Sequence, residues 1–453
     1  MFFVQSVVAG TAQNDTAFYC YVSLKGDNVI SVYKINQMEG IPEKIYDEPV
    51  SGGPASLALH PSKHYLYVAL RSANAISAYR IDPASGRLSP INSIPAVDNP
   101  VYISIDASGR FLLSAYFNAS KAAIYPINSD GSLQSAASLT VSTNINPHAI
   151  ITDPSNRFLY ITNMTGNSIL QYKFDTASGT IAPLEPAEVI PAEGTGPRHV
   201  VFHRSKNMVY VVNETGNSIT AYHVNENGTL KAFQTISTLP DGYDETNKCA
   251  DVHITPDNRF LFASNRGHES IAAFGIDPDT DSLTTIGHYN TVNSPREFDV
   301  DPIGTYLYAA GETSDNLAWY RIDKISGELD SLGCIETGKT PSWVLVAGFK
   351  NATTEVDDLL PESSPSEYDL KNCPNPFGSV TSIRWFLDEP CHIRVAVFDV
   401  SGRLVTKLMD GFLPGGFYSV DWKTENNKSD NCLYYCQLLT DRGCDVIKLV
   451  RIQ

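Results

Sequence analysis

Basic residues are scarce in this sequence relative to acidic ones. Lys and Arg number 33 against 50 Asp and Glu, so the 453-residue chain has a formal net charge of −17. A chain this acidic repels nucleic-acid phosphates, and no basic patch offsets the charge, so we expect no nucleic-acid partner. Long apolar runs are also lacking, and we expect no membrane span. Hydrophobic residues still make up 42% of the chain, which is enough for a large core.

Several motifs that carry chemistry are absent as well. The sequence has no Gly-rich nucleotide loop, no Gly-x-Ser-x-Gly nucleophile turn and no constellation of metal ligands, so we expect no cofactor and no metal. Of the eight cysteines, five lie near the C-terminus, at positions 373, 391, 432, 436 and 444. Their spacing names no pairing. Without paired histidines we favour buried thiols or one disulfide over a zinc site.

What the sequence does contain is a repeat of short strand-like runs. Its clearest copy is Gly196-Pro-Arg-His-Val-Val-Phe-His, followed by runs beginning at Met208, Ser218 and Leu230, with turn residues between them. Copies 45 to 53 residues apart begin at Pro54, Pro100, Pro147, Pro197, Ala250 and Pro295. This spacing is typical of the four-stranded blades of a β-propeller and is too long for most solenoid repeats.

Two fragments of the repeat remain outside these copies. Pro341–Gly348 resembles a lone first strand, and residues 17–50 contain the other three strands without a first one. We predict that they join into a seventh blade, because this closure removes the open edge that a row of radial sheets would leave. The predicted fold class is therefore all-β, with a seven-bladed propeller over residues 17–349 that both chain ends close. An open array of β-sandwiches is the alternative.

Two positions in each predicted blade converge at one mouth of the propeller channel. In an antiparallel blade, the first strand starts and the second strand ends on the same face of the disc. The residues just inside the first strands are Ala55, Val101, His148, Arg198, Asp251, Arg296 and Ser342. The residues after the second strands are Lys25, Arg71, Phe117, Met164, Glu214, Arg266 and Glu312. Most of the charge falls on consecutive blades, so we expect a charged arc at the mouth.

The residue types of this arc suit an anionic or carbonyl-bearing small molecule. Arginines bind carboxylate or phosphate and stabilise an oxyanion, so we expect Arg198 and Arg266 to hold the carbonyl or an acidic group of the substrate. Glu214 or His148 would activate a water or move a proton. Further substrate contacts are expected from His199, Asp251, Arg296, Glu312 and Arg71. The alternative is a solvated rim whose ion pairs hold blade against blade.

Several motifs around these residues resemble one family of propellers. The matching pieces are Asn146-Pro-His, Gly196-Pro-Arg-His-Val-Val-Phe-His, Tyr210-Val-Val-Asn-Glu, Ala250-Asp-Val-His-Ile-Thr-Pro-Asp, Ser264-Asn-Arg-Gly and Ser294-Pro-Arg. They are similar to the lactonase family of seven-bladed propellers, which contains the bacterial 6-phosphogluconolactonases and is related to the carboxy-muconate cyclases. The resemblance implies metal-independent opening or closing of a lactone ring, with His148, Arg198, Glu214 and Arg266 as catalytic residues. One departure is Tyr116-Phe-Asn, where the family usually has Asn-Tyr-Asn.

Both ends of the chain differ from the repeat. Residues 1–16 resemble either the back half of a secretory signal that lacks its charged front or a frayed start. Residues 350–371 are acidic and rich in Ser and Pro, which predicts an extended linker. Over residues 372–453, β-type runs return between turns such as Asp399-Val-Ser-Gly, and we expect a small immunoglobulin-like sandwich.

This C-terminal region resembles a second family. Cys373-Pro-Asn-Pro-Phe, Val397-Phe-Asp-Val-Ser-Gly-Arg and Gly415-Gly-Phe-Tyr are similar to the C-terminal sorting domain of type IX secretion. The resemblance implies a secreted or cell-surface protein that meets the secretion machinery. If the N-terminal signal is not real, the protein would be cytoplasmic.

The two resemblances disagree about the substrate, because an exported enzyme would seldom meet a 6-phosphosugar lactone. We expect a hydrolase that opens a sugar-type lactone. The alternative is a non-enzymatic propeller that binds a protein, a glycan or a small anionic ligand. The fold alone does not separate these two functions.

Overall fold

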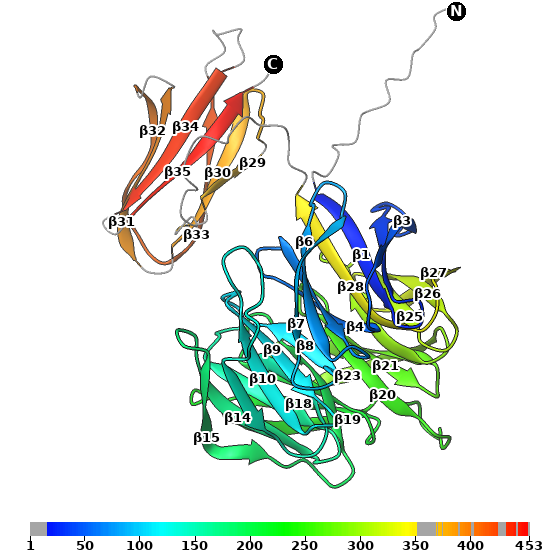
Figure 1. Cartoon of the computed structure of the whole chain (residues 1–453). Coiled ribbons are helices and arrows are strands. Elements are labelled where there is room, and N and C mark those ends of the chain that lie inside the picture. The colour runs from blue at the N-terminus through cyan, green and yellow to red at the C-terminus, as the bar shows by residue number, and fades with distance from the viewer. Residues whose placement is uncertain are drawn as a thin grey trace, which may run out of the picture. The chain divides into compact units, whose positions relative to one another are not determined.

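The structure is a computed structural model of the chain (Figure 1). It describes residues 16–350 and, beyond them, residues 368, 370–373, 375–387, 390–399, 403–424, 432–440 and 443–451. Contacts divide the chain into two compact units, Met1–Thr353 and Thr354–Gln453. The predicted N-terminal signal and most of the predicted linker lie outside the described residues. Within the described ranges, no helix is long and apolar enough to cross a membrane.

Residues 16–350 form seven four-stranded antiparallel sheets, which the repeat predicts. Six of these sheets are each made of four consecutive strands. Their strands are β4 (Pro54–Leu59), β5 (Tyr65–Leu70), β6 (Ala75–Ile81) and β7 (Leu88–Pro95); β8 (Tyr102–Ile105), β9 (Phe111–Tyr116), β10 (Lys121–Pro126) and β11 (Leu139–Ser142); β12 (Pro147–Thr152), β13 (Phe158–Asn163), β14 (Ser168–Asp175) and β15 (Thr180–Val189); β16 (Pro197–Phe202), β17 (Met208–Asn213), β18 (Ser218–Val224) and β19 (Leu230–Ser237); β20 (Lys248–Ile254), β21 (Phe260–Arg266), β22 (Ser270–Ile276) and β23 (Leu283–Asn290); β24 (Pro295–Val300), β25 (Tyr306–Gly311), β26 (Asn316–Ile322) and β27 (Leu329–Glu336).

The remaining sheet is built from both ends of the propeller, in the order β28-β1-β2-β3. Its strands are β1 (Thr16–Leu24), β2 (Val29–Ile35), β3 (Pro42–Pro49) and β28 (Pro341–Lys350). Val22 of β1 pairs with Val344 of β28 in an antiparallel register. The Tyr308 hydroxyl of β25 donates a hydrogen bond of 2.8 Å to the Gly40 carbonyl, which ties the preceding sheet to this one. The predicted closure by both chain ends is therefore confirmed.

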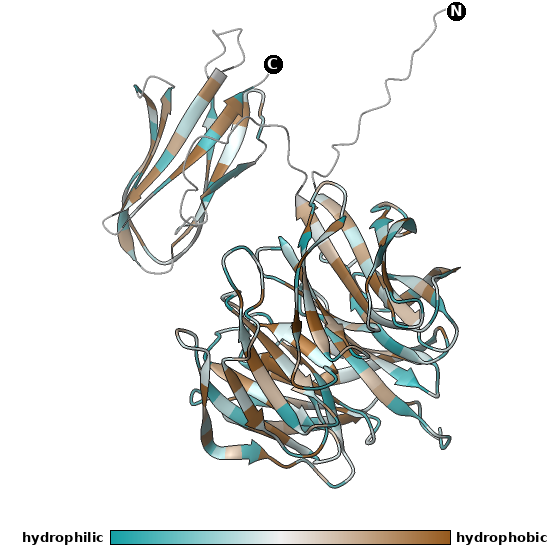
Figure 2. Ribbon diagram, viewed as in Figure 1, coloured by the Kyte–Doolittle hydropathy of each residue, from teal (hydrophilic) through white to brown (hydrophobic). Residues whose placement is uncertain are grey.

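The first strands of the seven sheets form a closed ring. Going round it, β28, β4, β8, β12, β16, β20 and β24 each contact the next, and β24 contacts β28. Second strands such as β9 and β17 are buried along their whole length, because neighbouring sheets cover both of their faces. Outer strands such as β3 are largely exposed. Figure 2 shows the corresponding hydropathy, with apolar residues concentrated on the strands and hydrophilic residues at the connecting loops.

The propeller core lies between neighbouring sheets. One cluster joins Val22 and Tyr33 of the closing sheet to Tyr308 and Leu317 of the sheet before it. Full burial of a large apolar side chain stabilises a fold by about 1.5–3 kcal/mol. Each sheet is therefore anchored by its neighbours, and the strand ends at the mouth are free to carry polar side chains.

Turn chemistry explains the regular spacing of the blades. The residue before each third strand has a left-handed backbone, with φ between 45° and 58°. These residues are Asn28, Asn74, Ser120, Asn167, Asn217, Glu269 and Asp315. Asn and Asp tolerate this conformation better than other residues with a side chain, and they hold most of the seven positions. The same turn in each blade places the residue after each second strand at an equivalent point of the mouth.

The C-terminal unit is a second all-β structure. One of its sheets contains β29 (Lys371–Cys373), β30 (Val380–Leu387) and β33 (Gly416–Lys423). The other contains β31 (Cys391–Asp399), β32 (Leu404–Leu413), β34 (Cys432–Thr440) and β35 (Cys444–Arg451). Trp385 and Trp422 of the first sheet share one core with Val395 and Leu438 of the second. The two sheets therefore pack face to face as a sandwich. Its immunoglobulin type stays a prediction.

The cysteines that the structure describes include buried thiols. Cys20, Cys249 and Cys436 are buried, and Cys334 is exposed. Burial raises the pKa of Cys249 and of Cys436 to about 12, so both are protonated and unreactive at neutral pH. The side chains at positions 373, 432 and 444 lie outside the described set, so a disulfide among them stays a prediction.

Candidate active site

Eight of the fourteen strand ends that the sequence predicts to meet at the propeller mouth line one cavity, and Arg198, Glu214, Asp251 and Arg266 are not among its lining residues. His148 and Arg296 are the second residues of β12 and β24, and Glu312 follows β25 directly. All three line one cavity. The other lining residues are Lys25, Ala55, Ser56, Arg71, Val101, Glu297, Ser342 and Trp343. Three predicted substrate contacts, at positions 71, 296 and 312, therefore lie together with His148.

Arg198 is the centre of a buried ion-pair cluster. Its side chain is fully buried, with Nε 3.1 Å from Glu214 Oε2 and Nη2 3.2 Å from Glu297 Oε1. Its Nη1 donates to the Ala250 carbonyl. Arg266 Nη2 lies 3.1 Å from the same Glu214 oxygen. Glu214 thus bridges two guanidinium groups, and every nitrogen of Arg198 has a protein partner.

The two arginines control the ionisation of Glu214. Burial by itself raises the pKa of Glu214, but Arg198 and Arg266 outweigh burial and hold the pKa below its ordinary value. Glu214 is therefore a carboxylate at neutral pH, and a weakly basic one. Burial together with Arg198 lowers the pKa of Arg266 to about 10, so its guanidinium stays charged. The Arg266 side chain is 14% exposed and is the more accessible of the two arginines.

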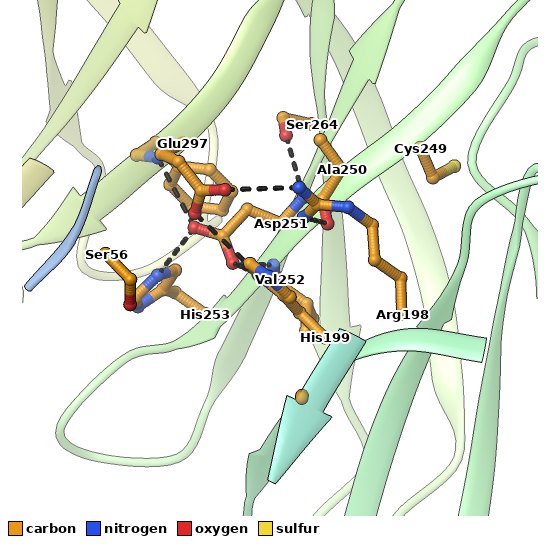
Figure 3. A network of polar contacts seen from close by, with 12 residues as sticks. Ser56, Arg198, His199, Cys249, Ala250, Asp251, Val252, His253, Ser264 and Glu297 are labelled. Carbon is orange, nitrogen blue, oxygen red and sulfur yellow. Dashed lines mark hydrogen bonds and ion pairs between the residues drawn. The ribbon is translucent and has the colours of Figure 1, made fainter. Parts of the chain in front are cut away.

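Histidines and carboxylates connect this cluster to the cavity (Figure 3). Asp251 Oδ1 lies 2.8 Å from His199 Nδ1, and Asp251 Oδ2 lies 3.0 Å from His253 Nε2. The other ring nitrogen of His253 lies 3.3 Å from Asp299 Oδ1. Burial by itself lowers the pKa of His253, but Asp251 and Asp299 outweigh burial and raise that pKa to about 9. His253 is therefore a cation held between two carboxylates.

His199 has the opposite charge state. Burial and Arg198 lower the pKa of His199 to about 3, although Asp251 acts in the other direction. The neutral ring therefore donates its Nδ1 hydrogen to Asp251. Its faces and edges pack against Tyr102, Trp343 and His148, with ring centroids 5.1, 5.7 and 5.1 Å away. A direct substrate contact from His199 stays a prediction.

Glu297, which the sequence analysis does not select, joins the cavity to the cluster. It is 2% exposed and hydrogen-bonds to Asp251. Burial and Asp251 raise the pKa of Glu297 well above its ordinary value, so the carboxyl keeps a proton and shares it with Asp251. His199, Asp251 and Glu297 also bring three ligand atoms within 4.8 Å of one another. Arg198, 3.2 Å from Glu297, would repel a metal ion, so the arrangement favours a shared proton.

His148 is the neutral imidazole of the cavity wall. The residue is 4% exposed, and its Nδ1 has no hydrogen-bond partner among the described residues. Burial and Arg198 hold the pKa of His148 well below its ordinary value. Phe117 belongs to the Tyr116-Phe-Asn motif, which departs from the family pattern. Its ring packs edge-on against the His148 ring, with the two ring centroids 5.8 Å apart. A neutral imidazole beside a cavity can accept a proton from a bound molecule.

Local irregularities in the first strands explain why the sequence analysis misses Glu297 beside Arg296. The register shifts between Pro295 and Glu297, and again between Cys249 and Val252. Such bulges insert an extra residue and re-aim its neighbours, so strict alternation no longer says which side chains face the channel. Runs of polar residues at a strand start, such as the adjacent charges at positions 296 and 297, are the signal that could have found Glu297.

The fold and the site together define a class of protein. It is a seven-bladed propeller whose mouth combines a buried arginine–carboxylate cluster with a cavity that contains a neutral histidine. The family model described as lactonase, 7-bladed β-propeller, matches residues 11–103 and 92–346. The chain belongs to this lactonase family.

Two curated relatives of this chain are both named 6-phosphogluconolactonase. The 6-phosphogluconolactonase of Serratia proteamaculans is 32% identical over 182 residues, which cover 39% of this chain and 53% of that protein. The 6-phosphogluconolactonase of Yersinia pestis is 32% identical over 231 residues, which cover 51% of this chain and 69% of that protein. The chain thus spans about half the length of the first of these relatives.

Solved structures share the propeller. The periplasmic gluconolactonase of Pseudomonas aeruginosa has a TM-score of 0.68 at 24% identity, covering 73% of this chain and 99% of that one. A protein from Lactobacillus plantarum has a TM-score of 0.67 at 22% identity, with 73% and 99% covered. At these identities the likeness shows the fold alone.

Proposed function

We propose that the propeller is a metal-independent hydrolase that opens a sugar-type lactone at its mouth. The observation that carries this proposal is the neutral His148 in the same cavity as Arg71 and Arg296. Attack of water on an ester carbonyl needs a base and positive charge for the developing oxyanion, and this cavity offers both. Membership of the lactonase family and the names of the curated relatives support it.

The reaction would proceed in two steps. His148 accepts a proton from water while the water oxygen bonds to the lactone carbonyl carbon, and the carbonyl oxygen takes up a negative charge that Arg71 and Arg296 stabilise. The ring C–O bond then breaks, and the His148 imidazolium gives its proton to the departing ring oxygen. One lactone and one water give one hydroxy acid, which is ionised at neutral pH.

The ion-pair cluster around Arg198 supports the proposed reaction indirectly. Glu214 is held by two guanidinium groups that lower its pKa, so its carboxylate is engaged in ion pairs and is not the base of this proposal. Arg198 is fully buried and would act on the substrate through its charge and through the positions of Glu214 and Glu297. Arg266, which is 14% exposed, is the more accessible arginine of the pair.

A pair of substitutions tests these roles. His148→Gln should lower kcat/KM for lactone hydrolysis by about 10²–10⁴, the usual worth of a positioned acid–base group. Its Tm should stay close to that of the wild type, because His148 Nδ1 has no hydrogen bond to lose. Glu214→Gln should also lower the rate, but with a fall in Tm, because Arg198 and Arg266 lose the carboxylate that they share. Acid release in a pH-stat and thermal melts measure both effects.

The same measurements can also contradict the proposed function. Hydrolysis by His148→Gln at the wild-type rate would show that another group is the base. If the wild type hydrolyses no member of a broad lactone panel, the propeller is better described as a binding module for a small anionic ligand, a glycan or a protein.

We further propose that the C-terminal unit directs export through type IX secretion, so that the propeller acts outside the cytoplasm. The motifs around Cys373, Val397 and Gly415 support this, and the unit has a core of its own that could be recognised separately. A gluconolactonase of the same fold is periplasmic in Pseudomonas aeruginosa, so this fold and export can occur together.

A further inference from the structure

Trp343 is the largest apolar side chain among the residues that line the cavity. It is half-buried, and most of its neighbours in the wall are charged or small, such as Arg71, Arg296 and Ala55. The residue that the strand count predicts for this part of the mouth is Ser342, directly before Trp343 in the chain. Trp343 therefore adds a flat apolar surface to a mainly polar wall.

A bulge at the start of β28 explains why two adjacent residues line the cavity. Trp343 pairs with Ser23 of β1, and the register shifts between Ser23 and Leu24, which leaves Ser342 as the extra residue of β28. Such a bulge re-aims the side chains beside it. The Ser342 hydroxyl donates a hydrogen bond of 3.0 Å to the Pro54 carbonyl of β4. The strand start that carries Trp343 is therefore fixed to the next sheet.

Two aromatic rings hold the indole of Trp343 in place. The Tyr102 ring lies at a centroid distance of 5.8 Å and an interplanar angle of 67°, and the His199 ring lies at 5.7 Å and 51°. Neither ring is parallel to the indole, so neither is stacked over it face to face. The packing fixes the orientation of the indole before a ligand arrives, and a preorganised side chain loses little further freedom on binding.

Trp343 lies across the mouth from His148. Going round the ring of first strands, β28 and β12 are separated by β4 and β8, which is the greatest separation that seven sheets allow. Arg296 belongs to the sheet before that of β28, and Arg71 belongs to the sheet after it. The two arginines that we propose for the oxyanion therefore flank Trp343, and the proposed base lies opposite.

We propose that the indole of Trp343 is a platform on which the planar ester group of the lactone lies. The inference rests on the proposed function and adds to it the residue that orients the substrate. An indole offers its flat apolar face to the ring carbons of the lactone, while the polar wall takes the oxygens. Water attacks a carbonyl carbon from above or below the ester plane. With one face on Trp343, only the face toward His148 is open to the attacking water.

Substitutions at Trp343 test the platform by its effect on KM. Trp343→Leu should raise the KM for glucono-δ-lactone about tenfold, because one aromatic contact is lost. Trp343→Phe keeps a flat ring and should stay within about threefold of the wild type. The control is Phe233→Leu, which removes an exposed aromatic ring from β19 and should keep the wild-type KM. Initial rates in a pH-stat give the constants.

Binding without turnover provides a second measurement. Glucono-δ-lactam has a planar ring amide in place of the ester, so it serves as an unreactive probe. Calorimetry should show about tenfold weaker binding to Trp343→Leu than to the wild type. The lactam should also change the tryptophan emission of the wild type but not that of Trp343→Phe, because none of the other three tryptophans lines the cavity.

The outcomes separate the platform from a structural role and from the proposed function. An unchanged KM and an unchanged lactam affinity in Trp343→Leu would overturn the platform and leave lactone hydrolysis standing. Lactam binding that depends on Trp343, without hydrolysis of any lactone, would support the platform and refute the proposed function. If melting curves show that Trp343→Leu is unstable, the emission decides, because a lactam that binds the wild type without changing its emission does not lie on the indole.

Discussion

Of three histidines near the mouth, His148 and His199 are neutral and His253 is charged. Asp251 contacts both His199 and His253. The second acidic group beside His199 is Glu297, at 3.7 Å, whose raised pKa keeps it protonated, whereas His253 has Asp299 beside it at 3.3 Å. His199 lies near Arg198 and is neutral, with a pKa of about 3, whereas the pKa of His253 is about 9. Burial lowers the pKa of both rings, so the balance of the charges around each ring decides its state: Arg198 acts with burial on His199, whereas Asp251 and Asp299 together outweigh burial at His253.

This difference predicts how stability depends on pH. The pKa of His253 is about 9 in the folded chain and about 6.5 in an unfolded one. Its ion pairs therefore stabilise the fold fully below pH 6.5, and this contribution is lost as the pH rises to 9. With the side chain 32% exposed, we expect a loss on the order of 2 kcal/mol between pH 6 and pH 9. Urea unfolding at the two pH values measures it.

Substitution of His253 separates its contribution to the pH dependence of stability from that of other titrating groups. His253→Gln keeps a hydrogen-bond donor toward Asp251 but cannot titrate, so its stability should fall less between pH 6 and pH 9. The control is His223→Gln on β18, where the histidine is exposed, and it should behave as the wild type does. The same pH dependence in His253→Gln and in the wild type would mean that other groups dominate.

At the scale of the element, β28 decides whether the propeller is closed. It pairs with β1 from Thr16 to Leu24, and it carries Val344 and Val346 into the core that the closing sheet shares with its neighbour. Without β28, the backbone groups of β1 would form an open edge, which is a template for pairing with other chains. The closing blade therefore depends on residues from both ends of the propeller.

Removal of β28 should destabilise the propeller. Deletion of residues 341–349 is expected to lower the Tm and to produce aggregates, measured by light scattering during size-exclusion chromatography. The control is a chain that ends at residue 353, which lacks the C-terminal unit but keeps β28. A monomeric deletion variant with the Tm of this control would show that closure is not needed.

At the scale of the whole molecule, the chain combines two units with separate cores. The propeller clusters and the cluster of the C-terminal unit share no residue. Because each core is complete within its unit, we expect the chain that ends at residue 353 to melt cooperatively and to keep the kcat/KM of the full chain. Loss of the cooperative melt would show that the units fold as one.

The same truncated chain tests the proposed export. In a host with type IX secretion, the full chain should reach the cell surface or the medium, whereas the chain without the C-terminal unit should stay inside. Cell fractionation with an antibody against the propeller measures the difference. Equal export of both forms would assign the C-terminal unit another role.

The sequence by itself determined the architecture of the propeller. The repeat, its spacing and the two fragments at positions 17–50 and 341–348 were sufficient to predict seven blades and their closure, because a strand pattern and a count of strands are local properties. The position of His148, Arg296 and Glu312 at one mouth followed from the same count, since strand polarity alone decides which ends meet.

Only the tertiary structure decided what these residues do to one another. A bulge in β24 brings Glu297 to the cavity beside its neighbour Arg296, against the alternation that a sequence predicts. Charge is set by residues that the fold brings together: Glu214 is shared by Arg198 of its own sheet and Arg266 of the next, while Lys25 lies near Arg71 and Arg71 near Arg296. The strength of an electrostatic interaction depends on the distance between the charges and on their burial. Both are set by segments that lie far apart in the chain, so no local sequence pattern predicts these charge states.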